Sequence, residues 1–411
     1  MRPGVLPANG MRLDTATDGR PPDVATRCWR PEPATLGGVP MGLYLHVPFC
    51  VRRCGYCAFS TVAVGEMLDP TLADRFLGSV EAELDLAAAV LGPQRPPLDT
   101  IYLGGGTPTM LDPPRIRRVL DAVRRRFELT AWVEISIESN PDGLVPGQLA
   151  AMRDSGVDRI SFGLQSVRTH VLAVLDRTHD PQRALDAVHG AHAAGFDHVG
   201  LDLIHGTPGE TAQDWHDTLT AAIATQVDHI SAYALSIEPG TKLSARVRSG
   251  ALRTPCGDEA ADRYSVADEL LGADGFEWYE LSNWARSPAA RSRHNLGYWR
   301  NHHWWGIGPS AHSHVAGRRW WNHDQVGTWS TALEAGRSPE AGHEVLDIGA
   351  RSMEKMMLGI RLAEGLALSS VPTRTAIPGL LADGLLEEHG DRVVLTLRGR
   401  LLADHVVRSL A

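Results

Sequence analysis

The stretch CVRRCGYCAFS at residues 50–60 decides how the rest of the chain is interpreted, because it places three cysteines close together at Cys50, Cys54 and Cys57. The 411-residue chain has only five cysteines in all. In a reducing compartment, clustered cysteines are more often metal ligands or catalytic groups than disulfide partners. Three thiolates leave a metal centre one ligand short, so the chemistry depends on what completes it.

A cubane [4Fe–4S] cluster normally takes four thiolates, and this loop supplies three. The fourth iron then stays open to a small chelating ligand, and S-adenosylmethionine offers an amine and a carboxylate on one carbon. An electron passed from the cluster to the nearby sulfonium would release a 5′-deoxyadenosyl radical. Two other interpretations fit the spacing alone, namely a structural zinc site with His46 as its fourth ligand, or free cytosolic thiols.

The composition indicates an ordinary globular protein, with 43% hydrophobic and 22% charged residues. The formal net charge of −9 argues against nucleic acid as a partner, since nucleic-acid binding needs a basic face. The sequence has no apolar run long enough for a transmembrane helix, and its N-terminus lacks the apolar core of a signal peptide. We therefore expect a cytoplasmic protein.

The pattern of apolar segments predicts an α/β fold. Residues 1–41 are rich in Pro, Gly, Thr and Asp without periodicity, which predicts a disordered leader that includes Cys28. Folded sequence is expected to begin at GLYLHVPF (42–49). Because alternating strands and helices form parallel sheets with right-handed crossovers, residues 42–240 are predicted to form a partial, open-sided (β/α)6 barrel. Its further strands are expected at 99–103, 132–139, 157–166, 197–206 and 228–236.

Polar residues follow these strands where each one ends. GGGTP comes after the second strand, Glu138 ends the third, Gln165 ends the fourth and Asp202 lies in the fifth. Sites in such folds lie at the carboxyl ends of the strands, so these side chains are expected to share one site.

The last third of the chain departs from this rhythm. Residues 241–342 are interpreted as an aromatic and His-rich extension, since residues 278–329 hold eight of the eleven Trp and six of the eighteen His. Residues 343–411 suggest a helix, a hairpin at Gly390–Asp391 and another helix, which is typical of a winged-helix-like domain. The near balance of acidic and basic residues there gives little support to DNA binding.

Several motifs in order resemble those of the oxygen-independent coproporphyrinogen III oxidase family, within the radical S-adenosylmethionine superfamily. The resemblance covers the chain from about residue 42 to its end. The motifs are YLHVPFC before the cluster cysteines, YLGGGTPT (102–109), IESNP (137–141), SFGLQS (161–166), LDRTH (175–179) and GLDLIHGTPGET (200–211).

The resemblance implies a role for each matching position. Cys50, Cys54 and Cys57 would ligate the [4Fe–4S] cluster. S-adenosylmethionine would lie beside Tyr44, Tyr56, Gly105, Gly106, Thr107, Glu138, Gln165, Arg177, Asp202 and Ala234. Taken alone, the glycines would indicate a simple strand-to-helix turn, and the two carboxylates would indicate capping or salt-bridged groups.

One departure separates two branches of the family. The oxidases carry a further cysteine two residues after the third cluster ligand, and this chain has Phe59 there. The HemW-type haem chaperones lack that cysteine and carry HNxxYW, which matches His294, Asn295, Tyr298 and Trp299. A histidine with aromatic neighbours suits haem, because imidazole binds the iron and flat rings cover the porphyrin. Without the motif, His294 and the Trp-rich run would be interpreted as core residues that close the barrel.

The branch implies a haem chaperone that binds haem, a [4Fe–4S] cluster and S-adenosylmethionine, and that passes haem to an acceptor haem protein such as a respiratory cytochrome. Membrane contact, if there is any, would come through that acceptor. The alternative is an oxygen-independent coproporphyrinogen III oxidase, which decarboxylates its substrate oxidatively to protoporphyrinogen IX. The residues leave open whether S-adenosylmethionine is turned over, and so whether the protein is an enzyme.

Overall fold

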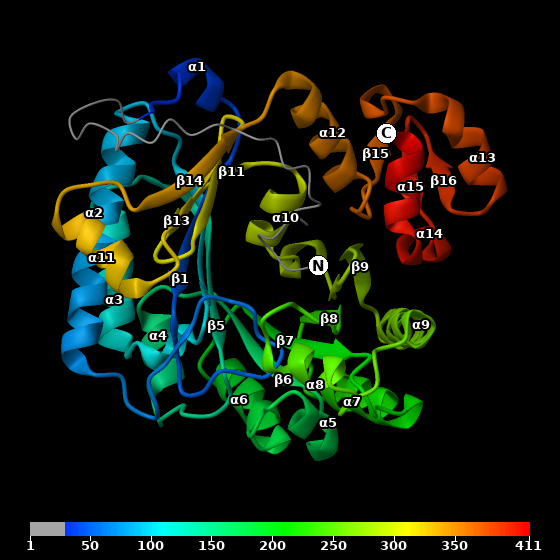
Figure 1. Ribbon diagram of the computed structural model, residues 1–411, viewed down its shortest axis with the longest axis horizontal. Helices are drawn as coiled ribbons and strands as arrows, with labels where there is room; N and C mark the ends of the chain where they lie inside the picture. The colour runs from blue at the N-terminus through cyan, green and yellow to red at the C-terminus, as the bar shows by residue number, and fades with distance from the viewer. Residues whose placement is uncertain (1–28) are drawn as a thin grey trace.

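The computed structural model describes residues 29–411, and its main feature is a twelve-stranded sheet. Six strands at the centre of this sheet lie side by side in chain order, and each neighbouring pair is parallel. They coincide with the six predicted strands, which confirms the (β/α)6 prediction; most of them are labelled in the ribbon diagram (Figure 1). Their bounds are β1 (Met41–Val47), β4 (Leu98–Gly105), β5 (Leu129–Ser139), β6 (Arg159–Gln165), β7 (His198–His205) and β8 (His229–Ala234).

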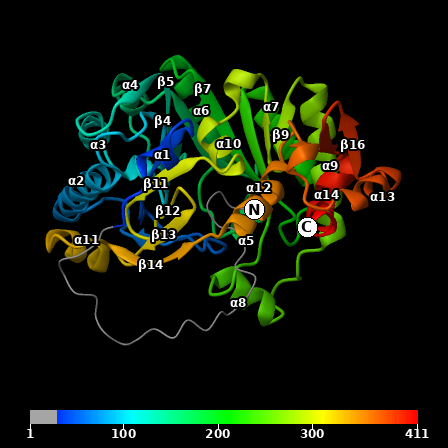
Figure 2. The same ribbon diagram turned by 90° about the horizontal axis from the view of Figure 1, so that it is seen from above.

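Helices between these strands cover the outer face of the curved sheet (Figure 2). In α3 (Pro113–Arg124), the Asp112 side chain accepts a hydrogen bond from the Arg115 backbone N–H, and proline occupies the first helical position. The apolar stripe of α3 is buried as its periodicity predicts. The other helices of this layer are α2 (Pro70–Leu91), α4 (Gln148–Asp154), α5 (Thr169–Val174), α6 (Pro181–Ala193) and α7 (Ala212–Ala224).

The parallel strands do not close on themselves, because the two outer ones pair with strands from the aromatic extension. β1 pairs in parallel with β11 (His303–Ile307), and β8 pairs in antiparallel fashion with β10 (Asn283–Ala285). Antiparallel strands continue the sheet beyond both. They are β12 (His312–Val315), β13 (Arg318–Asn322) and β14 (Glu340–Val345) on one side and β9 (Glu277–Glu280) on the other. Helices α8 (Lys242–Arg248), α9 (Gly257–Ala273), α10 (Arg293–Trp299) and α11 (Val326–Glu334) belong to the same part of the chain.

The predicted disordered leader is wrong for residues 29–41. Helix α1 (Pro33–Leu36) ends with a Leu36 side chain that is 1% exposed, and β1 begins at Met41, which is fully buried. Trp29 packs against Trp320 of β13, with ring centroids 5.9 Å apart. These apolar side chains anchor a segment whose overall composition suggested disorder. The rest of the predicted leader, with Cys28, lies outside the described residues.

The C-terminal part has a hydrophobic core of its own, to which Met356, Ile360, Val393 and Leu395 contribute. A three-stranded antiparallel sheet packs with helices there, as the winged-helix-like prediction requires (Figure 1). Within the described residues, no helix combines the length and apolar character needed to cross a membrane. The elements are α12 (Ile348–Gly359), β15 (Leu366–Ala367), α13 (Ile377–Ala382), β16 (Leu386–His389), β17 (Arg392–Leu395), α14 (Leu397–Leu401) and α15 (Ala403–Leu410).

Candidate functional site

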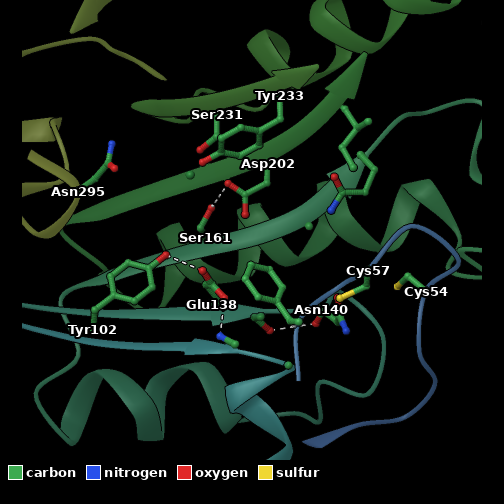
Figure 3. A pocket seen from close by; sticks show the side chains of 18 of the residues that line it. Cys54, Cys57, Tyr102, Glu138, Asn140, Ser161, Asp202, Ser231, Tyr233 and Asn295 are labelled. Carbon is green, nitrogen blue, oxygen red and sulfur yellow. Dashed lines mark hydrogen bonds between the residues drawn. The ribbon is translucent and has the colours of Figure 1, made fainter. Parts of the chain in front are cut away.

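A cavity of about 940 Å³ runs through the interior of the open barrel. Its size is at the upper end for sites that hold small organic ligands, roughly 300–1,000 Å³. The cysteine loop lies at one end of the cavity and Asn295 of α10 lies at the other (Figure 3). The predicted residues that line it are Tyr44, Cys50, Cys54, Tyr56, Cys57, Gly105, Gly106, Glu138, Gln165, Arg177, Asp202, Ala234, His294, Asn295 and Tyr298.

The cysteine loop connects β2 (Phe49–Cys50) to β3 (Val62–Ala63) and is fixed by backbone contacts. Gly55 donates its N–H to the Leu175 carbonyl at 3.0 Å and accepts from the Leu243 N–H at 2.8 Å. A Cβ at Gly55 would lie 2.3 Å from the Asp176 carboxylate, so a larger residue between Cys54 and Tyr56 would have to displace that side chain. The loop is therefore held in place at its centre as well as at its ends.

None of the three cysteines forms a disulfide within residues 29–411; Cys50 is buried and the other two are half-buried. No three His, Cys, Asp or Glu side chains in residues 29–411 converge where one metal ion could sit. His46 could not readily complete a zinc site, since its ring nitrogens are hydrogen-bonded to the Tyr44 hydroxyl and the Ser60 carbonyl. A cubane needs no single point of convergence, because each thiolate binds a different iron. The geometry fits the cluster better than zinc.

The glycine-rich turn after β4 packs closely against the cysteine loop. Gly105 has φ +111°, and a Cβ there would lie 2.6 Å from the His46 ring. A Cβ at Gly106 would lie 3.0 Å from the Cys50 sulfur. Thr107, which is buried and does not line the cavity, donates its hydroxyl to the same sulfur at 3.7 Å. Glycines here let the backbone approach a ligand bound beside the cysteines.

Arg177 offers a positive charge next to the cysteine loop. Its guanidinium donates to the Asn140 side chain and to the Gly163 carbonyl, both at 2.8 Å, and lies 3.6 Å from the Cys54 sulfur. Its Nε is buried and has no hydrogen-bond partner within the described residues. Buried polar groups are normally paired, so this donor fits a ligand carboxylate such as that of S-adenosylmethionine.

Two carboxylates lie deeper in the cavity, one on β5 and one on β7, with β6 between these strands. Glu138 accepts hydrogen bonds from the Tyr102 hydroxyl at 2.7 Å and from the Gly105 N–H at 3.2 Å. Asp202 accepts from the Ser161 hydroxyl at 3.0 Å (Figure 3). Burial, and then the charge of Asp202, raises the pKa of Glu138 to about 7. Burial likewise raises the pKa of Asp202. Two acceptors held in this way suit the hydroxyl groups of a ribose.

We expect the Glu138→Gln variant to be more stable than the parent at pH 8. The folded-state pKa of Glu138 lies above the ordinary value, so its protonation stabilises the fold. This contribution is present at low pH and is lost as the pH rises through about 7. The amide avoids that loss, and the free energy of unfolding in urea should rise by roughly 1–3 kcal/mol at pH 8. The gain should shrink as the pH falls and vanish near pH 4, below the ordinary glutamate pKa of about 4.3, and Glu269→Gln, at an exposed position of α9, should show neither effect. Equal stabilities of parent and variant at pH 8 would contradict the raised pKa.

The HNxxYW motif forms helix α10 at the end of the cavity away from the cysteines. Glu134 accepts hydrogen bonds from the Arg293 and His294 backbone N–H groups, both at 3.1 Å, and pairs with Arg159 at 3.2 Å. The His294 ring is buried, with Nδ1 2.7 Å from the Thr100 hydroxyl and Nε2 2.9 Å from the Tyr298 hydroxyl. Burial lowers the pKa of His294 to about 4, so the ring is neutral at pH 7.

The structure separates one member of this motif from the others. Trp299 packs on a small cluster with Tyr279, Leu296 and Leu362 and does not line the cavity. Sequence reasoning also missed several cavity residues. They are Tyr102, Ser161, Ser231, Tyr233, Trp304 and His312. Inward-facing positions two residues apart along the strands could have indicated Tyr102 and Ser161.

The sequence model of the Radical SAM superfamily matches residues 44–222 of this chain. The chain is 48% identical over 379 residues to the heme chaperone HemW of Mycobacterium tuberculosis H37Rv, covering 92% of this chain and 96% of the relative. It is 30% identical to the heme chaperone HemW of Bacillus subtilis, covering 88% and 97%. The solved coproporphyrinogen III oxidase HemN from Escherichia coli superposes with a TM-score of 0.77 over 92% of both chains, and at 21% identity this likeness shows the fold alone.

Proposed function

The chain belongs to the HemW-type haem chaperone family of the radical S-adenosylmethionine superfamily, and from this premise we propose that it binds haem in the barrel cavity and passes it to an acceptor haem protein. Membership implies a [4Fe–4S] cluster and S-adenosylmethionine as cofactors. The observation that carries the proposal is one cavity with the three-cysteine loop at one end and most of the HNxxYW motif at the other.

A reduced [4Fe–4S] cluster with S-adenosylmethionine bound to it would supply one-electron chemistry at this end of the cavity. The chain's own residues hold and orient that cofactor. Cys50, Cys54 and Cys57 would bind three irons, and the unpaired Nε of Arg177 would bind a carboxylate. The glycine turn keeps the backbone close to the cysteine loop.

Haem is an apolar disc with two carboxylate side chains. The cavity offers aromatic rings for the disc and arginines for the carboxylates. Tyr298 and Trp304 present aromatic rings, with centroids 4.8 Å apart in an edge-on arrangement. Arg52 and Arg53 are exposed on the cysteine loop and line the same cavity. Guanidinium groups are well suited to carboxylates, and aromatic rings to a flat apolar ligand.

Phe59 supports a carrier over an oxidase, because it stands where the oxidases have a further cysteine. The test is to reconstitute the protein without oxygen, reduce it, and offer coproporphyrinogen III with S-adenosylmethionine. We expect no protoporphyrinogen IX, together with saturable binding of about one haem per chain when the same material is titrated. Decarboxylation of coproporphyrinogen at a catalytic rate would replace this proposal with the oxidase.

A further inference from the structure

A second histidine in the cavity wall has the features of an iron ligand. His312 begins strand β12, lines the cavity and is exposed. Its ring lies against Trp321 of the neighbouring strand, with centroids 5.9 Å apart and planes 28° apart. Its backbone carbonyl accepts a hydrogen bond from the Trp304 indole at 3.0 Å. The imidazole therefore stands among flat aromatic rings at the edge of the cavity.

The other histidines that line the cavity are buried, and hydrogen bonds hold their rings. His46 and His294 have both ring nitrogens bonded, and His229 has its Nε2 2.8 Å from the Tyr279 hydroxyl. In the part of the chain that the structure describes, neither ring nitrogen of His312 has a hydrogen-bond partner. Partial burial of the ring against its neighbours, and then the charge of Arg319, lowers the pKa of His312. The imidazole is therefore neutral at pH 7. Iron needs a neutral, accessible imidazole nitrogen.

The HNxxYW motif is connected to His312 by direct contacts. The His294 ring is hydrogen-bonded to the Tyr298 hydroxyl, and the Tyr298 ring packs edge-on against Trp304. Trp304 in turn donates to the His312 carbonyl. A ring buried like that of His294 could reach iron only after breaking its bond with Tyr298, whereas His312 needs no such rearrangement.

We propose that His312 supplies the imidazole that coordinates the haem iron and that His294 is a positioning residue, which holds Tyr298 and, through it, Trp304 beside His312. This inference rests on the proposed haem binding and names its iron ligand. The motif then acts by shaping the wall on which the porphyrin lies.

The test titrates the anaerobically reconstituted full-length protein with haem and records affinity, absorption and electron paramagnetic resonance spectra. In His312→Gly we expect haem affinity to fall roughly tenfold or more. Mutating residues that only hydrogen-bond to a metal ligand already lowers metal affinity by about 10–100-fold, and here the ligand itself is removed. The spectral signature of histidine ligation should also disappear, and added imidazole should restore it. His294→Gln should bind haem more weakly, keep that signature and gain nothing from imidazole. The control His343→Ala, on exposed strand β14, should match the parent.

Retention of the parent's affinity and histidine signature in His312→Gly would overturn the inference. Loss of the signature in His294→Gln with rescue by imidazole would assign the iron to His294 and would also overturn it. Cluster absorption in each variant shows that the protein is folded. A parent that binds no haem would defeat the proposed function itself, and this inference with it, so the two failures are distinguishable.

Discussion

The Cys54→Ala variant should lose most of its iron and acid-labile sulfide after anaerobic reconstitution, by roughly tenfold relative to the parent. The cubane has only three protein thiolates, and removing one leaves two irons without a protein ligand. Cys54 lies beside Arg177 in the loop held at Gly55, so no other cysteine of the described residues can take its place without moving the loop. The loss should therefore be nearly complete.

Cys256→Ala is the matched control for this result. Cys256 is also a free, half-buried thiol, but it lies directly before α9 and does not line the cavity. Its variant should keep the parent's iron, sulfide and brown colour. Equal iron and sulfide contents in Cys54→Ala and the parent would contradict the three-cysteine cluster. Bound zinc in the parent instead of iron would contradict it as well.

The Glu134→Gln variant should lose about 3–5 kcal/mol of unfolding free energy at pH 7, which is typical when one partner of a buried ion pair is removed. Glu134 and Arg159 are 6% and 5% exposed, so the guanidinium would be left buried without its counter-charge. Glu134 also accepts the Arg293 and His294 N–H groups at the start of α10. The variant should thus loosen the HNxxYW helix as well as destabilise the fold.

The pH dependence of this ion pair has a definite sign. Burial alone would raise the pKa of Glu134, but the charge of Arg159 and the two backbone N–H groups outweigh burial and lower it. The stabilisation is therefore present above the ordinary pKa of a glutamate and is lost as the pH falls through the lowered value. Urea unfolding of the apoprotein at several pH values measures it. Glu128→Gln, an exposed residue just before β5, should change stability by less than about 0.5 kcal/mol, and a similarly small change in Glu134→Gln would contradict the account.

The central barrel could be predicted because its sequence signals are local. Apolar strands alternate with capped helices, and the carboxyl ends of parallel strands must meet at one edge of a sheet. Gly105, Gln165 and Ala234 each end a strand and line the cavity as this rule requires. The cysteine spacing and the ordered motifs supplied the chemistry.

The edges of the sheet could not be predicted because they depend on distant pairing. Strand β11 pairs with β1 across about 260 residues of sequence, and in the sequence its HWWGI segment is indistinguishable from the rest of the aromatic run. The same run concealed the difference between Trp299, which packs in a small core, and Trp304, which lines the cavity. The motif singles out His294 in the sequence, but the sequence does not show that the His294 ring is buried and hydrogen-bonded on both nitrogens whereas His312 is exposed.

The most direct test of haem carriage is transfer between proteins. The reconstituted, haem-loaded chain is mixed with a haem-free haem protein, the two are separated, and the haem on each is measured over time. The account predicts that haem leaves this chain, appears on the acceptor and restores the acceptor's absorption spectrum. Haem that stays on this chain while the same acceptor takes up free haem would contradict it.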